Sequence, residues 1–414
     1  MNIALKHTNG EEALLGLLQK AGQQGAESLQ SIRQTGLPTR RVEAWHYTDL
    51  RKLLNAYPEV GTSSEGTAKS ALSACKFSLP CVTLPLINGS YHPELATTLP
   101  QKVLVAGYTQ SRDPVNIAKD DAIGLMNAGL VSEGLTIIVN ENAMIEDRIC
   151  LSHIMTDENS AATRHHIKIG TGASLTLLER HLTANRVAAV TNTICDLEVG
   201  DGSIVTWVID QRLCDLATRF GQLNIKLGAN AELTILLLNS GGKLVRQEIK
   251  VDVSGEGSQL NIRGVNLIGE GAHIDVTTRL DHLVPDTVSN EIFRNVVVGN
   301  GHGVFQGQIN VASVAQKTDA RMACNSLLLS DDSEFSAKPE LEIFADDVQC
   351  AHGATVTDID ENHLFYLMAR GIPEKQAREL LITAFVAEVF ENLEVEQIGE
   401  ALNERIENWL GDNG

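Results

Sequence analysis

A repeat of glycine turns in the middle of the sequence constrains the fold more than any other feature. In each copy an apolar segment ends at a glycine, and a second apolar segment begins five residues later. The glycines are Gly170, Gly200, Gly228 and Gly255, so successive copies are 30, 28 and 27 residues apart, and Gly299 begins a fifth copy. A period of roughly 20 to 50 residues is typical of a solenoid, a propeller or another repeat array.

The segments between these turns are rich in Val, Ile and Leu, for example at residues 175–178, 204–209, 233–238 and 307–311. They lack the longer helical patterns that an alternation of strands and helices would need. The sequence therefore predicts a mainly β fold, a β-solenoid in which strands of successive coils pair and aliphatic side chains form ladders inside. Aromatic residues are only 4% of the chain, which agrees with an aliphatic core.

Helices are expected at both ends of this solenoid. Leucines at helical spacing predict an N-terminal helical cap at residues 11–54, and Thr, Ser, Gly and Glu predict a flexible connection at residues 62–69. From Ile372 onward the apolar spacing predicts two helices with a break near Glu394. We expect a helical region and linker at residues 1–100, the solenoid core at residues 101–355, and a helical domain at residues 356–414.

The charge balance excludes several kinds of partner. The formal net charge is −20, whereas proteins that bind nucleic acids or anionic membranes on their own gather positive charge. No apolar run reaches the roughly 18 residues of a membrane helix, and the start has no secretion-signal pattern. Seven scattered cysteines form neither a disulfide framework nor a zinc motif. We therefore expect a cytoplasmic protein that binds no nucleic acid and no membrane.

The C-terminal helices are acidic. Between residues 374 and 407 there are nine Glu residues against Lys375, Arg378 and Arg405. Such a pattern indicates either a solvated helix face or a docking surface for a basic partner.

Familiar catalytic motifs do not occur in the sequence. Gly241-Gly242-Lys243 lacks the upstream Gly and the following Ser or Thr of a phosphate-binding loop, so we expect a turn there and no bound nucleotide. There is no GxSxG motif, and His165-His166 is interpreted as a solvent-facing strand pair rather than a metal site. The chain is not expected to be an enzyme.

Residues 340–353 contain the densest cluster of reactive side chains. On a strand, Cys350 and His352 project from the same face, as do Glu340 and Glu342. A thiolate, an imidazole and carboxylates are ligands that iron accepts. Two ligands do not complete a site. Either a second chain supplies more, or Cys350 and His352 are a buried thiol and a hydrogen-bonded core histidine.

Residues 338–356, with the sequence KPELEIFADDVQCAHGATV, resemble the signature of the SufB/SufD family of iron–sulfur cluster assembly proteins. Residues 317–320, 364–367 and 370–372 resemble further parts of the family pattern, and residues 36–48 are similar to the start of the SufD branch. The Cys-rich N-terminal region typical of the SufB branch does not occur. Three positions depart from the family pattern: Gln349 stands where a basic residue is common, Ala351 where Ser is common, and Thr357 where Gly is common.

The resemblance implies a right-handed parallel β-helix between helical terminal domains. It also implies a non-catalytic scaffold subunit of the SufBCD complex, which pairs with SufB and docks the SufC ATPase. His352 falls on the histidine that builds a nascent iron–sulfur cluster at the SufB interface, so a transient cluster or iron is expected there, and Cys350 carries over with less weight. The sequence does not decide whether the isolated chain forms a homodimer. It also does not identify the sulfur donor, the cluster type or whether reduced flavin binds the complex.

The resemblance places the SufC contact in the C-terminal helical region. The residues carried over are Ile372, Pro373, Ala377, Leu381 and Phe385.

Two alternatives remain. In the first, the chain is a purely structural subunit whose Cys350 and His352 pack or cap the end of the β-helix. In the second, it is a β-helix enzyme that acts on polysaccharides. A fold alone does not confer a function, and the sequence lacks paired carboxylates and aromatic sugar platforms, so the second is the weaker alternative.

Overall fold

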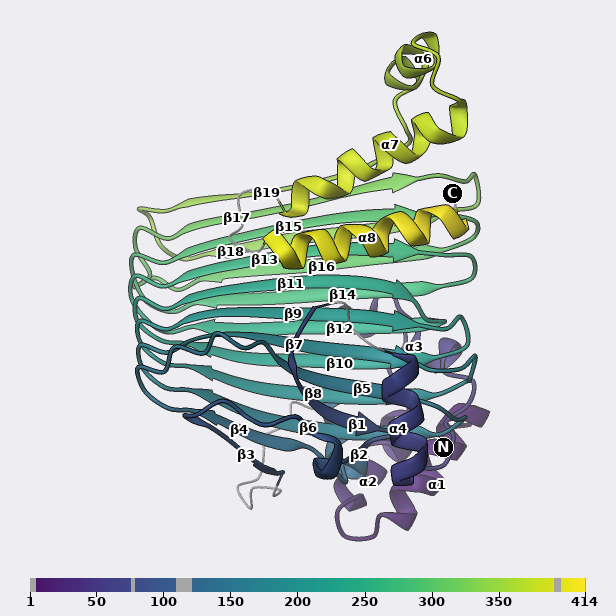
Figure 1. Cartoon of the computed structure of the whole chain (residues 1–414), viewed down its shortest axis with the longest axis vertical. Coiled ribbons are helices and arrows are strands. Elements are labelled where there is room, and N and C mark those ends of the chain that lie inside the picture. The colour runs from purple at the N-terminus through teal and green to yellow at the C-terminus, as the bar shows by residue number, and fades with distance from the viewer. Residues whose placement is uncertain (1–4, 76–78, 109–120, 391–395, 414) are drawn as a thin grey trace.

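Two long sheets of parallel strands face each other along the length of the molecule (Figure 1). The structure is a computed structural model that describes residues 5–75, 79–108, 121–390 and 396–413. From residue 135 onward, consecutive strands alternate between the two sheets, so each pair of strands makes one coil. This arrangement confirms the predicted mainly β fold with a parallel solenoid core.

The ten-stranded sheet contains β1 (Val82–Ile87), β2 (Ser90–Tyr91), β5 (Ile149–Met155), β7 (Ser174–Thr183), β9 (Ile204–Leu213), β11 (Glu232–Gly241), β13 (Gln259–Ile268), β15 (Val288–Val297), β17 (Asp319–Leu328) and β19 (Gln349–Thr357). The nine-stranded sheet contains β3 (Val103–Gly107), β4 (Leu135–Val139), β6 (Ser160–Ile169), β8 (Val190–Val199), β10 (Thr218–Leu227), β12 (Leu244–Val253), β14 (His273–His282), β16 (His302–Val311) and β18 (Glu334–Ile343). Successive coils pair in parallel, whereas β2 and β3 pair antiparallel with β1 and β4.

The glycine repeat has the length of one coil. Gly170, Gly200, Gly228 and Gly255 lie in successive turns that lead from the nine-stranded to the ten-stranded sheet. A Cβ atom on Gly255 would lie 1.9 Å from the carbonyl carbon of Gly228, because adjacent turns touch through their backbones. The expected fifth copy at Gly299 is wrong, since this glycine lies between β15 and β16, in a turn at the opposite ends of the strands.

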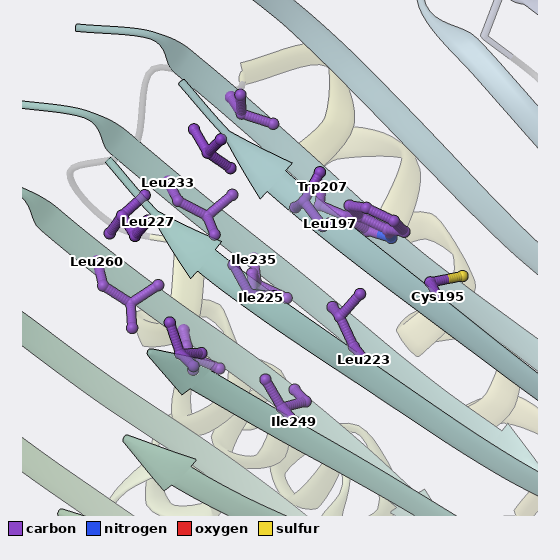
Figure 2. Packing of buried hydrophobic residues seen from close by; sticks show 14 of the residues in the cluster. Cys195, Leu197, Trp207, Leu223, Ile225, Leu227, Leu233, Ile235, Ile249 and Leu260 are labelled. Atoms are coloured by element: carbon purple, nitrogen blue, oxygen red, sulfur yellow. The ribbon is translucent and has the colours of Figure 1, made fainter. Parts of the chain in front are cut away.

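Aliphatic ladders fill the space between the two sheets (Figure 2). In the ten-stranded sheet Leu233 pairs in register with Leu260 of the next coil. In the nine-stranded sheet Leu223 pairs with Ile249 in the same way. All four side chains are buried. Burying one such side chain contributes about 1.5–3 kcal/mol, so repetition over many coils stabilises the solenoid.

The helices predicted for residues 11–54 are present as α1 (Asn9–Lys20), α2 (Ala26–Thr35) and α3 (Leu50–Leu53), with the 3-10 helix η1 (Glu43–Trp45). Together with α5 (Ala122–Leu130), which was not predicted, they cover the outer face of the nine-stranded sheet. The guanidinium of Arg246 on β12 lies 3.9 Å from the ring centroid of Trp45 and donates a 2.8 Å hydrogen bond to the carbonyl of Ala44. These contacts anchor the N-terminal region to the solenoid.

The expectation of a flexible connection at residues 62–69 is wrong. Helix α4 (Glu65–Ala74) begins in this segment, and the Ser64 side chain caps it by accepting a 3.2 Å hydrogen bond from the backbone N–H of Thr67. Ala68 and Ala71 pack near β1 on the ten-stranded sheet. The short 3-10 helix η2 (Pro93–Leu95) comes after β2 in the chain. The small polar residues are therefore an N-cap and a first helical turn.

The C-terminal helices α6 (Glu361–Ala369), α7 (Glu374–Ala387) and α8 (Glu396–Asn413), with the 3-10 helix η3 (Glu388–Phe390), pack mainly on the outer face of the ten-stranded sheet. Arg294 of β15 donates a 2.7 Å hydrogen bond to Glu388 and holds this region in place. In Figure 1, α8 lies along the strands and α6 projects beyond β19. The expected break near Glu394 lies outside the described residues. In the part of the chain that the structure describes, no helix has the length and hydrophobicity to span a membrane.

Candidate functional site at the open end of the solenoid

The last coil of the solenoid ends in a free edge. Strand β19 pairs in parallel with β17, and it is the outermost strand of its sheet among the described residues. Strand β18 is the outermost strand of the other sheet. Almost every residue of β19 is exposed. The backbone N–H and C=O groups along one side of β19 are therefore available to a further strand.

Cys350 and His352 lie on the inward-facing side of this edge strand. In the parallel register Cys350 pairs with Ala320 and His352 with Met322, and both partners are buried in the solenoid interior. Cys350 is half-buried against that interior, whereas His352 is exposed. The sequence-predicted pair is thus brought together at the open end, on one face of one strand.

The environment of Cys350 favours the thiol over the thiolate. Burial raises the pKa of Cys350, the nearby carboxylate of Asp319 adds to the increase, and a backbone hydrogen bond with Ala320 opposes it. A metal ion that binds this sulfur would have to displace its proton.

The two carboxylates of the predicted cluster lie elsewhere. Glu340 and Glu342 are on β18, where they pair in register with Gln308 and Asn310. Both glutamates line a groove on the outer face of the nine-stranded sheet, and Lys338 forms a 3.1 Å ion pair with Glu340. The structure separates them from Cys350 and His352 because the inward-facing residue of this segment is Leu341, which lies between them. This chain therefore offers two ligands at the open end.

The five residues expected to contact SufC differ in exposure. Pro373 is exposed, and Ala377 is fully buried in the cluster beneath the C-terminal helices. Ile372, Leu381 and Phe385 are partly buried and pack against the same cluster.

The exposed apolar side chains of this region lie on neighbouring positions that the sequence analysis did not select. Phe365 and Tyr366 on α6 are 72% and 57% exposed, and Leu380 on α7 is also exposed. The adjacent aromatic residues Phe365 and Tyr366 were the signal available in the sequence.

A second group of reactive side chains, missed by the sequence analysis, lies deep inside the solenoid. His153 of β5 and Glu179 and His181 of β7 bring three potential ligand atoms within 4.8 Å of one another. The interpretation of His165 as solvent-facing is wrong, because its side chain is buried beside this cluster, and its ring centroid lies 5.1 Å from that of His153. The signal was the 28-residue separation of His153 and His181, which equals one coil.

A long parallel solenoid with reactive side chains at an unpaired end, and helices on both outer faces, defines a β-solenoid protein with one open sheet edge. Residues 153–385, more than half of the chain, match the SufBD core domain of the SUF system for iron–sulfur cluster assembly. The chain therefore belongs to the SufBD family, and the resemblance of residues 338–356 to that family is confirmed.

Individual relatives agree with this assignment. The chain is 29% identical over 394 residues to the iron–sulfur cluster assembly protein SufD of Escherichia coli (strain K12), which covers 94% of this chain and 92% of the relative. It is 25% identical over 400 residues to an iron–sulfur cluster assembly SufBD family protein of Synechocystis, over 90% of this chain and 86% of the relative. A SufD of Plasmodium falciparum is 25% identical over 237 residues, which are 56% of this chain and 16% of the relative.

Proposed function

We propose that this chain is a scaffold subunit of an iron–sulfur cluster assembly complex, in which it pairs with SufB and docks the SufC ATPase. The chain catalyses no step itself. His352, with Cys350 beside it, binds iron or the nascent cluster as transient cargo at the interface with SufB. The unpaired edge of β19, which carries both side chains at the end of the solenoid, is the observation that carries the proposal.

The pairing rests on what an open sheet edge requires. Exposed edge strands are normally covered or blunted, because they present unpaired backbone groups to other chains. Here Phe344 is 68% exposed and Val356 is also exposed, so the edge adds apolar surface to its free hydrogen-bonding groups. A strand of a second solenoid would pair with β19 and supply the ligands that Cys350 and His352 lack.

The SufC contact is assigned to the surface formed by Phe365, Tyr366, Pro373 and Leu380 on α6 and α7. The glutamates of α7 next to it in sequence, Glu374 and Glu379, are paired with Arg378 and Lys375 of the same helix, so the contact is mainly apolar. When two ATPase subunits associate on binding ATP, they would shift the two scaffolds against each other and open the interface. This is coupling through a two-state assembly.

The substitution His352→Ala tests the cargo role. In cells that depend on this pathway, we expect cluster formation to fall at least tenfold, while pull-down still recovers SufB and SufC with the variant. The matched control is His46→Ala, which removes an exposed histidine of the N-terminal region and should leave cluster formation unchanged.

Two outcomes would contradict the proposal. Normal cluster formation by the His352→Ala complex would remove the histidine from the chemistry. Loss of the complex, or a clearly lower melting temperature of the variant, would instead support the alternative of a purely structural subunit.

A further inference from the structure

We propose that His153, Glu179 and His181 form a metal site inside the solenoid, which binds one divalent transition-metal ion of the class of Zn²⁺ and Fe²⁺. The inference is independent of the proposed function, because this cluster lies on β5 and β7, several coils away from β19 in the strand order. Two imidazole nitrogens and one carboxylate oxygen are the donor set that these ions take in proteins.

The three residues meet because the coils are in register. His153 pairs with His181 across the parallel β5–β7 ladder, and Glu179 is two residues before His181, so all three side chains point to the solenoid interior. Each of the three is more than nine-tenths buried. The Nε2 atom of His181 lies 2.7 Å from Oε1 of Glu179, so the two atoms share a hydrogen bond. A bound ion would take the place of the proton in this hydrogen bond.

Several nitrogen atoms of the cluster have no hydrogen-bond partner. Nε2 of His153 and Nδ1 of His181 are both buried without one. A buried polar atom without a partner costs about 1–3 kcal/mol, so two of them in one cluster require an explanation. A metal ion would use the lone pair of Nε2 of His153 directly, and at His181 it would replace the proton that Nε2 now shares with Glu179.

Neighbouring groups orient the carboxylate of Glu179. Oε2 of Glu179 accepts a 3.2 Å hydrogen bond from Trp207 and a 3.7 Å contact from the thiol of Cys195. Oε1 is thereby left for the ion, with its carboxylate orientation set by the other oxygen.

The neighbours also define which groups are not ligands. Nδ1 of His165 accepts a 3.1 Å hydrogen bond from the backbone N–H of Leu135, so its Nε2 carries the proton and cannot coordinate. The guanidinium of Arg219 donates at 2.7 Å to Gln247 and lies 3.8 Å from Oε1 of Glu179, outside hydrogen-bonding distance. Arg219 therefore attracts the carboxylate of Glu179 through its charge, but it forms no hydrogen bond with Oε1.

Ion binding requires one local movement. The rings of His153 and His181 are stacked, with centroids 4.6 Å apart and planes 14° from parallel. An ion lies in the plane of each ring that it binds, so one ring must turn about χ2, a torsion with a broad and shallow energy profile. The loaded protein should therefore have lost this stack.

The location also dictates when the ion enters. The cluster is closed off by two packed sheets, so the ion is captured as the coils form, and folding and binding are coupled. Chelators should remove it slowly from the folded chain and quickly from the unfolded chain.

The first experiment measures the metal content of the full chain after long dialysis against EDTA. We expect about one Zn²⁺ or Fe²⁺ ion per chain in the parent, and at least a fivefold lower content in His153→Gln and in His181→Gln. Unfolding the parent in guanidinium with EDTA should release the ion, and refolding with Zn²⁺ should restore it with a higher melting temperature than refolding without metal.

Two controls separate this site from others. His282→Gln removes another buried histidine, whose ring nitrogens are satisfied by the hydroxyls of Thr287 and Ser289, and it should keep the ion. The double variant Cys350→Ser/His352→Ala removes the two ligands of the open end and should also keep it. A parent without metal, or equal metal content in all variants, would overturn the proposal and leave a metal-free hydrogen-bonded cluster.

Crystals of the unsubstituted chain refolded with Zn²⁺ provide a test that needs no variant. We expect an anomalous difference peak at the zinc absorption edge, about 2.0–2.2 Å from ligand atoms of His153, Glu179 and His181. Its absence would overturn the proposal even if the glutamine variants fail to fold.

Discussion

Glu291 is a carboxylic acid placed in a hydrocarbon interior. On β15 it pairs in register with Ile262 of the preceding coil and Met322 of the following coil, and all three side chains are buried. Burial raises its pKa to about 8, and the hydroxyl of Thr278 opposes the increase. At neutral pH Glu291 is therefore mainly protonated in the folded chain.

The raised pKa of Glu291 predicts how stability depends on pH. Between its usual value of 4.5 and about 8, the folded chain retains a proton that the unfolded chain has released. The free energy of unfolding therefore falls as pH rises through this window and levels off above it. Glu291→Gln should remove this contribution and stabilise the chain at pH 8 by at most about 5 kcal/mol, since one pKa unit corresponds to about 1.4 kcal/mol.

Guanidinium unfolding at pH 5 and pH 8 measures this effect. The control is Glu232→Gln, which changes an exposed glutamate of β11 and should keep the pH dependence of the parent. An unchanged difference between the two pH values in Glu291→Gln would show that Glu291 is ionised in the folded chain.

At the scale of single residues, side chains that lie together on one strand could be predicted from the sequence, whereas side chains that meet across two paired strands were missed. Cys350 and His352 share a face because residues two apart on a strand always do. His153 and His181 meet only through the register between coils, which no local pattern contains. The spacing of Glu340 and Glu342 was correct, but the inward or outward direction of their face depends on how the coil closes.

The turns between coils make a specific prediction about glycine. Gly255→Ala would place a Cβ atom 1.9 Å from the carbonyl carbon of Gly228, against backbone that cannot move aside. We expect a loss of about 3 kcal/mol or more in the free energy of unfolding, the upper part of the range for overpacking. Gly202→Ala is the matched control: it has a φ of 62° but open space around the added Cβ, so it should cost only about 1 kcal/mol.

Denaturant unfolding of both variants checks this prediction. Equal losses would mean that the close contact between adjacent turns is not what requires glycine at residue 255.

The same turns explain why the repeat could be predicted only in part. Each contains one residue with positive φ, and successive coils place Asn142, Gly172, Gly202, Asn230, Gly257, Asp286 and Lys317 there. Glycine is favoured at such a position, but Asn and Asp also adopt it. The glycines of the predicted repeat lie two residues before this position, and the equivalent residues of the next two coils are Val284 and Ala315. The glycine pattern therefore stops at Gly255, while the backbone geometry continues for two further coils, and Gly299 was mistaken for the next copy.

For the molecule as a whole, the open end predicts self-association. The isolated chain should form dimers through the edge of β19, because Phe344 and Val356 expose apolar surface beside unpaired backbone groups. The double substitution Phe344→Lys/Val356→Lys should shift the chain to monomers and raise the dissociation constant at least tenfold. Met144→Lys, which changes a 70% exposed residue near the other end, should not.

Sedimentation over a range of concentrations measures this equilibrium. A chain that stays monomeric at high concentration, or a double variant that dimerises like the parent, would exclude the edge as the contact.

The arrangement of the helices around the solenoid was not predictable from their own sequences. Amphipathic spacing correctly indicated helices near both ends, since an apolar face must be buried somewhere. It does not say which sheet buries that face. The N-terminal helices mostly pack on the nine-stranded sheet and the C-terminal helices on the ten-stranded sheet, through contacts such as Trp45 with Arg246 and Glu388 with Arg294.

The antiparallel strands at the start of the solenoid limit its stoichiometry. A repeat fold with two open ends is a polymerising unit, because each copy offers an edge to the next. Here β2 has only two residues and β3 only five, and both run against the direction of the coils. Within the described residues, a long parallel edge is thus left at one end. A partner that pairs with this edge leaves no second long parallel edge for a further copy, so the fold favours pairs of solenoids over filaments.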